Sequence, residues 1–85
     1  MKKVEIYTLA YCPYCQKAKY LLKDHGVDFS EIQCDDDEER MREELTKKYE
    51  LKTLATFPQI IIDGINIGGY SDLKQKVESG EIVFK

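Results

Sequence analysis

The sequence predicts a small α/β domain with the element order β-α-β-α-β-β-α. Residues 4–8 alternate between apolar and polar side chains, which indicates a strand. Two stretches with apolar residues at helical spacing follow, and Asp63-Gly64 then separates two short apolar runs, as in a β-hairpin. The chain has 85 residues, so we expect one domain over residues 1–85.

The first expected strand ends just before Cys12, and the first expected helix begins at Pro13. Proline is favoured at the first helical position, because its missing N–H would be unpaired there anyway. A helix N-terminus carries unpaired N–H groups and a partial positive charge, and both favour a thiolate. We therefore expect Cys12 as a thiolate near the N-cap, with Cys15 one turn on and close enough to form a disulfide.

Two other interpretations of the cysteine pair are open. A zinc site needs four ligands, and only Cys34 and His25 could add to the pair. A purely structural disulfide would gain little, since so short a loop hardly restricts the unfolded chain. A C-x-x-C pair beside a β-α-β pattern is more typical of a redox-active dithiol.

The first helix is expected over residues 13–25 and ends before Gly26, a natural C′ residue. His25 would act in the last turn as a capping or dipole partner. Lys17, Lys19 and Lys23 are expected on the solvated outer face of this helix. In the alternative interpretation Lys17, less than two turns from the cysteines, would add to the stability of the thiolate. The buried stripe of this helix is expected to consist of Ala18, Leu21 and Leu22.

Residues 27–34 predict the second strand, with Val27, Phe29 and Ile32 pointing inward. A strand-helix-strand unit of this length favours a right-handed crossover and parallel pairing. Cys34 would close the strand as a small, partly buried apolar residue. A regulatory or metal-binding thiol is the alternative role for it.

Residues 35–39 are all acidic, but they lack the glycine and ligand spacing of a calcium loop. We expect them to begin the second helix, with Asp35 or Asp36 as the N-cap. The buried stripe of this helix would consist of Met41, Leu45 and Tyr49.

The third strand is expected to open at Pro58, where the missing N–H does little harm. Three consecutive isoleucines over residues 60–62 indicate a strand covered on both faces. A final helix follows Gly69, capped by Ser71 or Asp72. Glycines before a capped helix either make a tight turn or let backbone N–H groups approach a ligand carboxylate.

The composition excludes some classes of function. The net charge is −3 and the aromatic residues do not interleave with a basic stripe, so we expect no nucleic-acid binding. No apolar run approaches the ~20 residues that span a bilayer, so we expect no membrane partner. An odd number of cysteines and the absence of a signal-peptide pattern favour the cytoplasm.

Three motifs together resemble the glutaredoxin family, over about residues 3–80. They are Cys12-Pro13-Tyr14-Cys15, Thr56-Phe57-Pro58-Gln59-Ile60 and Gly68-Gly69-Tyr70-Ser71-Asp72-Leu73. The resemblance implies the thioredoxin fold, with a four-stranded mixed sheet of order 2-1-3-4 flanked by three helices. It also implies glutathione as co-substrate, no bound cofactor and, in our expectation, a monomer.

The resemblance implies a glutathione site as well. Pro58 would follow a cis peptide bond, and the backbone of Phe57 would pair with the cysteinyl amide of glutathione. N–H groups near Tyr70 and Ser71 would bind the γ-glutamyl carboxylate, and Asp72 its ammonium group. The groove would be completed by Tyr14, Thr56 and Gly69.

Two positions depart from the family pattern. Leu9 stands where relatives carry a lysine or arginine that helps to bind the glycine carboxylate, and Lys52 is a candidate substitute. Phe57 replaces the usual valine, and its larger ring could narrow the groove or favour an apolar partner.

The implied activity is glutathione-dependent reduction of protein disulfides and protein–glutathione mixed disulfides by Cys12 and Cys15. One alternative is a glutaredoxin-like electron donor reduced by a thioredoxin reductase, suggested by Leu9. The other is an iron–sulfur cluster or metal carrier, which Pro13 and Cys15 make less typical.

Overall fold

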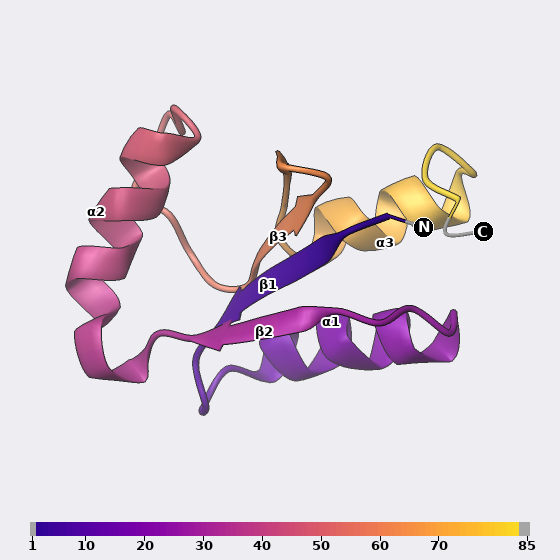
Figure 1. The fold of residues 1–85 in the computed structure, drawn as a ribbon, viewed down its shortest axis with the longest axis horizontal. Coiled ribbons are helices and arrows are strands. Elements are labelled where there is room, and N and C mark those ends of the chain that lie inside the picture. The colour runs from indigo at the N-terminus through magenta and orange to yellow at the C-terminus, as the bar shows by residue number, and fades with distance from the viewer. Residues whose placement is uncertain (1, 84–85) are drawn as a thin grey trace.

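The computed structural model describes residues 2–83 (Figure 1). The strands are β1 (Val4–Thr8), β2 (Ser30–Gln33), β3 (Gln59–Ile62) and β4 (Ile65–Gly68). The helices are α1 (Pro13–Asp24), a 3₁₀ turn (Asp35–Asp37), α2 (Glu38–Lys48) and α3 (Tyr70–Glu78). Within residues 2–83, none of the helices has the length and apolar character needed to cross a bilayer.

The four strands form one mixed sheet in the order β2-β1-β3-β4, as the resemblance implied. β1 and β2 are parallel and joined by α1, whereas the β1–β3 and β3–β4 pairs are antiparallel. β1 therefore lies in the middle of the sheet, and the chain leaves it directly toward the cysteine pair. This is the thioredoxin-like arrangement.

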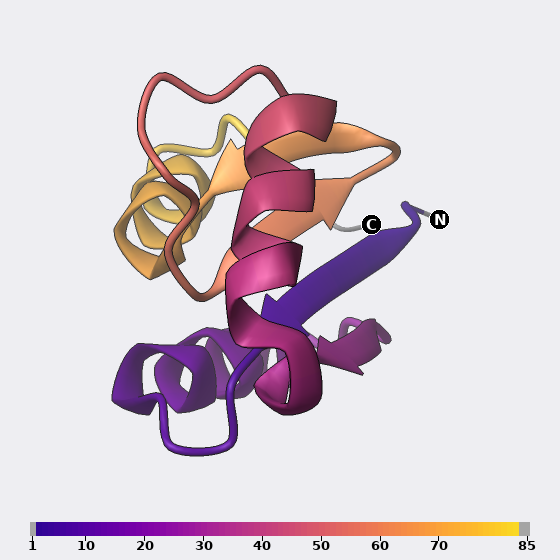
Figure 2. The same cartoon turned by 90° about the vertical axis from the view of Figure 1, so that its left-hand side faces the viewer.

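The main core lies between the sheet and the two helices α1 and α3, which share one face (Figure 2). Alternate residues of β1 and β3 point to this face, because Val4 pairs with Ile62 and Ile6 with Ile60. The buried residues of this core are Val4, Ile6, Ala18, Leu22, Ile60, Ile62 and Leu73. α2 lies apart from α1 and α3, across the end of the sheet where β1 and β2 finish (Figure 1).

The second strand is shorter than the sequence predicted. Val27 and Phe29 pack against the core as expected, but they precede the strand, which begins at Ser30. The reason is that the Val27 N–H still bonds to the Leu22 carbonyl of α1 and is not available to the sheet.

Ile32 does not point into this core. It pairs with Tyr7, on the opposite face from Ile6, and it is Glu31 that pairs with Ile6. Glu31 accordingly meets Lys19 of α1, at 2.9 Å. The prediction that Ile32 points into this core was therefore wrong, because its neighbour Glu31 is the residue on that face.

The start of the second helix was also predicted wrongly. Neither Asp35 nor Asp36 is its N-cap, since both belong to the 3₁₀ turn and α2 begins at Glu38 after Asp37. The Asp35 carboxylate instead accepts the Ala10 N–H at 2.9 Å, in the loop before the cysteines. Within the predicted stripe Leu45 is buried, whereas Met41 and Tyr49 are half-buried.

The hairpin and its turn follow the prediction. Asp63 and Gly64 both have positive φ, +52° and +81°, as a type I′ turn requires. All residues of β3 are buried, as the isoleucine run indicated. The cap of the last helix differs, because Gly69 is the N-cap and Ser71 and Asp72 lie inside the first turn.

Candidate active site

Cys12 is the N-cap of α1, as the sequence predicted. Its backbone is extended, and Pro13 is the first helical residue. Its Sγ accepts the backbone N–H of Cys15 at 3.1 Å, and its own N–H bonds to the Leu9 carbonyl at 3.2 Å. The half-buried sulfur thus faces the positive end of a helix, which favours a thiolate nucleophile.

Cys15 lies one turn into α1, and its side chain is fully buried. Burial is the main cause that raises the pKa of the Cys15 thiol to about 12, and its interaction with Cys12 adds to the effect. None of the three cysteines is in a disulfide in this structure. The side chain of Cys15 is therefore buried and holds its proton at neutral pH, whereas Cys12 is half-buried.

The opposite wall of the site is the loop that leads into β3. The peptide bond between Phe57 and Pro58 is cis, as the resemblance implied. The Phe57 carbonyl lies 3.7 Å from Cys12 Sγ. This loop is fastened from within, because Gln59, only 6% exposed, donates from Nε2 to the Thr56 carbonyl at 2.7 Å. The Phe57 backbone is thereby held next to the sulfur of Cys12.

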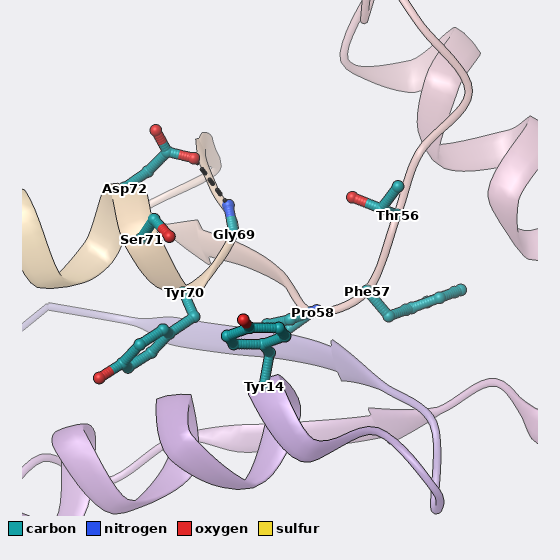
Figure 3. Close-up of a pocket in the computed structure, with 8 residues that line it drawn as sticks. All are labelled: Tyr14, Thr56, Phe57, Pro58, Gly69, Tyr70, Ser71 and Asp72. Atoms are coloured by element: carbon teal, nitrogen blue, oxygen red, sulfur yellow. Dashed lines mark hydrogen bonds between the residues drawn. The ribbon is translucent and has the colours of Figure 1, made fainter.

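A groove of about 220 Å³ lies beside this contact (Figure 3). It runs from α1, past the loop before β3, to the start of α3. Tyr14 and Tyr70 form one side of it, with their ring centres 6.1 Å apart. Its lining residues are Tyr14, Thr56, Phe57, Pro58, Gly69, Tyr70, Ser71 and Asp72. These are the eight residues that the sequence analysis assigned to a ligand groove.

The far end of the groove is the N-terminus of α3. The Gly69 N–H donates to Asp72 Oδ2 at 3.1 Å, so Asp72 closes the first turn from inside the helix (Figure 3). Gly68 is required beside it, because a Cβ there would lie 2.4 Å from Asp72 Oδ2. The N–H groups of the first turn and one carboxylate therefore offer complementary charges to a zwitterionic ligand.

Comparisons with known proteins agree with this geometry. The family model for glutaredoxin matches residues 4–67. A glutaredoxin from Pseudomonas aeruginosa is 45% identical over 82 residues, which cover 96% of this chain and 93% of the relative. The chain belongs to the glutaredoxin family. Its site is accordingly that of a thiol-disulfide oxidoreductase.

Solved glutaredoxin structures share the fold. Glutaredoxin 1 from Francisella tularensis, solved with cacodylate, superposes with a TM-score of 0.82 and 33% identity, over 95% of this chain and 98% of that one. A buckwheat glutaredoxin superposes with a TM-score of 0.81 and 23% identity, over 94% and 72% of the two chains. The second likeness concerns the fold alone.

Other candidate residues lie outside the glutaredoxin groove. His25 is the C-cap of α1, and its Nδ1 lies 3.0 Å from the Leu21 carbonyl, in agreement with the expected capping role. Cys34 is buried just after β2, and burial raises its pKa. Lys17 lies over the ring of Tyr14, with Nζ 5.1 Å from the ring centre. Among residues 2–83, no three His, Cys, Asp or Glu side chains are grouped as metal ligands would be.

The two departures from the glutaredoxin pattern are Leu9 and Phe57. The Phe57 ring points away from Tyr14 and the groove, so it does not narrow the groove as the sequence suggested (Figure 3). Leu9 is buried, so its side chain belongs to the core and not to the ligand surface. Lys52 lines a second cavity, of about 220 Å³, that adjoins the groove through Thr56, Gly69 and Asp72. Lys52 thus lies beside the end of the groove nearer to α3, where the resemblance places the γ-glutamyl group and not the glycine carboxylate.

The sequence analysis missed three residues that surround this site, Tyr11, Glu38 and Arg42. The hydroxyl of Tyr11 donates to Glu38, which also accepts from Arg42. One signal was present, because glutamate four residues before arginine is a favourable helical pair. Nothing in the sequence shows that these side chains link separate loops.

Proposed function

We propose that this oxidoreductase uses glutathione to reduce protein–glutathione mixed disulfides and protein disulfides. One observation supports this most: Cys12 Sγ lies 3.7 Å from the Phe57 carbonyl, at the edge of a groove with backbone donors and a carboxylate at its far end. The buckwheat glutaredoxin of the same fold was solved in complex with glutathione.

Glutathione would lie along this groove in an extended conformation. Its cysteinyl amide would pair with the backbone of Phe57 and leave its sulfur beside Cys12. The γ-glutamyl carboxylate would accept hydrogen bonds from the backbone N–H groups of Tyr70 and Ser71. A carboxylate has two oxygens, so Asp72 can accept the Gly69 N–H and also pair with the glutamyl ammonium group.

For a glutathionylated protein, the reaction takes two exchanges. The Cys12 thiolate attacks the glutathionyl sulfur, the bond to the protein sulfur breaks, and the protein thiolate leaves and takes up a proton. A second glutathione thiolate then attacks the glutathionyl sulfur on Cys12. Oxidised glutathione leaves and the Cys12 thiolate is restored.

For a protein disulfide, Cys15 has a second role. Cys12 attacks one sulfur of the disulfide and remains bonded to it, and the other sulfur leaves as a thiolate. Cys15, once deprotonated, attacks Cys12 Sγ, releases the second protein thiolate and closes the Cys12–Cys15 disulfide. Two glutathiones then reduce this disulfide and become one oxidised glutathione.

Two substitutions test this scheme in an assay with a glutathionylated peptide, glutathione, glutathione reductase and NADPH. Cys12→Ser removes the nucleophile, so turnover should fall to the uncatalysed rate. Cys15→Ser should keep turnover of this peptide within about threefold of the wild type, because the first pathway does not use Cys15. Reduction of a protein disulfide should be lost in both variants. An equal loss of peptide turnover in the two variants would contradict the scheme.

The burial of Leu9 supports one alternative electron source. Position 9 holds a buried leucine and not a cation that could bind the glycine carboxylate of glutathione. A thioredoxin reductase could therefore replace glutathione as the reductant of the Cys12–Cys15 disulfide. The same disulfide-reduction assay, run with each reductant separately, distinguishes the two. Faster reduction by the thioredoxin reductase than by millimolar glutathione would favour the alternative.

A further inference from the structure

Arg42 connects α2 to the loop that carries Phe57. Its Nη1 donates to the Ala55 carbonyl at 2.8 Å, and the centre of its guanidinium lies 4.9 Å from the centre of the Phe57 ring. Figure 3 shows the Phe57 side chain directed away from Tyr14 and the groove. Arg42 therefore holds this loop from outside, while the backbone of Phe57 faces the nucleophile.

Ala55 is fixed on both of its backbone groups. Its N–H donates to Thr46 Oγ1 at 2.9 Å, and Thr46 in turn donates to the Arg42 carbonyl at 2.6 Å. Ala55 is only 2% exposed, so water does not replace these bonds readily. The chain two residues before Phe57 is thus attached to α2 through both the side chain and the backbone of Arg42.

The same guanidinium also reaches the other wall of the site. Nη2 and Nε of Arg42 donate to Glu38 Oε2, at 2.9 and 3.2 Å. The second oxygen of Glu38 accepts the hydroxyl of Tyr11, the residue immediately before Cys12. A planar guanidinium can bind a carboxylate and a carbonyl at fixed angles, which a lysine ammonium cannot do.

We propose that Arg42 is a positioning residue that sets the place of the Phe57 backbone relative to Cys12, and thereby the affinity for the glutathionyl part of the substrate. The inference rests on the proposed function, in which Phe57 pairs with the cysteinyl amide. Small displacements at such a contact reduce productive binding strongly. The contacts that carry this inference join Arg42 to Ala55, Phe57 and Glu38, so we expect its loss to act on binding and not on the sulfur chemistry.

The test compares Arg42→Met with Arg40→Met. Arg40 lies on the same helix but is 61% exposed and pairs with Asp37 and Glu44. In Arg42→Met we expect KM for the glutathionylated peptide to rise about tenfold, with kcat within about twofold of the wild type. The alkylation rate of Cys12 by iodoacetamide should stay within about twofold, since this small reagent does not use the Phe57 backbone. Arg40→Met should match the wild type in all three measurements.

An unchanged KM in a folded Arg42→Met would overturn the inference, and so would a parallel fall of kcat and alkylation rate. If Arg42→Met does not unfold cooperatively, Arg42→Lys decides: a KM raised at least about threefold supports the inference, and an unchanged KM overturns it.

A second readout does not depend on glutathione. Exchange of the Ala55 amide proton should be at least about tenfold faster in the Arg42 variant than in Arg40→Met. If the wild type fails to turn over the peptide, the proposed function is wrong and this readout alone decides the positioning. Equal exchange in the two variants would overturn it.

Discussion

At the scale of single residues, Cys12 and Cys15 lie one helical turn apart in opposite environments. Cys12 is half-buried at the helix N-terminus, whereas Cys15 is fully buried and has a pKa of about 12, first because of burial and then because of Cys12. A mixed disulfide at Cys12 removes this second cause and makes Cys15 more acidic. In the proposed function, this change would prepare the Cys15 thiol for attack once Cys12 has reacted.

We expect iodoacetamide at pH 7 to modify Cys12 alone in the folded protein. Cys15 and Cys34 are buried and their pKa values are raised, so both hold their protons and react at least about hundredfold more slowly. Mass spectrometry of peptides after timed labelling measures the three rates. In urea all three should react alike, and labelling of folded Cys15 as fast as Cys12 would contradict the assignment.

At the scale of elements, local signals predicted the boundaries that local interactions determine. The start of α1 at Pro13 and the positive-φ turn at Gly64 depend on neighbours in the sequence, and both were predicted. The start of α2 depends on Asp35, whose carboxylate binds the distant Ala10 N–H. Such a contact exists only after folding, so the acidic run alone could not reveal it.

The candidate site divides in the same way. The structure brings together in one groove the eight residues that a family resemblance over three separate motifs assigned to it, and their role in binding stays a prediction. Arg42 was not predicted, because its partners lie on two loops whose approach no sequence pattern encodes. The last helix is capped by Gly69 and not by Ser71 or Asp72, and the local cause was missed: Asp72 at the third helical position accepts the Gly69 N–H.

The junction of β4 and α3 gives a prediction at this scale. Gly68 has φ of +111°, and a Cβ would collide with the Asp72 carboxylate. Gly68→Ala should therefore lower the free energy of unfolding by about 1–3 kcal/mol. It should also displace Asp72 and raise KM for glutathione about fivefold, equivalent to ~1 kcal/mol.

Gly80→Ala is the matched control for urea unfolding and glutathione kinetics. Gly80 also has positive φ, +78°, but a Cβ there meets nothing within 4 Å. Its substitution should cost about 1 kcal/mol of stability through backbone strain and leave KM unchanged. A similar rise in KM for both variants would show that Asp72 is not the cause.

At the scale of the whole molecule, the site lies where several elements begin or end. α1 and α3 both start there, and α2 lies across the end of β1 and β2 (Figure 1). Two positive helix ends therefore converge on the groove of a chain whose net charge is −3.

On the acid side, Glu31 contributes stability. Its bond with Lys19, followed by the bond from the Thr8 hydroxyl, lowers the pKa of this carboxyl. A lowered folded pKa gives stability that is present above the unfolded value of about 4.3 and is lost as the pH falls through the folded value. On the alkaline side, Cys15 and Cys34 have raised pKa values, so the folded state holds their protons where the unfolded chain releases them.

We therefore expect the free energy of unfolding, measured by urea titration, to be nearly constant between about pH 5 and 8 and to fall on both sides. Above the unfolded thiol pKa of about 8.5, each buried thiol contributes a loss of up to ~1.4 kcal/mol per pH unit. Because the pKa of Cys15 is raised to about 12, its contribution should persist throughout the range from pH 9 to 11.

Cys15→Ala should make the alkaline fall of the unfolding free energy less steep by the contribution of about one proton, ~1.4 kcal/mol per pH unit. Lys74→Ala, an exposed change on α3, should leave this slope unaltered. Equal slopes in the wild type and Cys15→Ala would mean that Cys15 ionises alike in the folded and unfolded chains, which its complete burial does not allow.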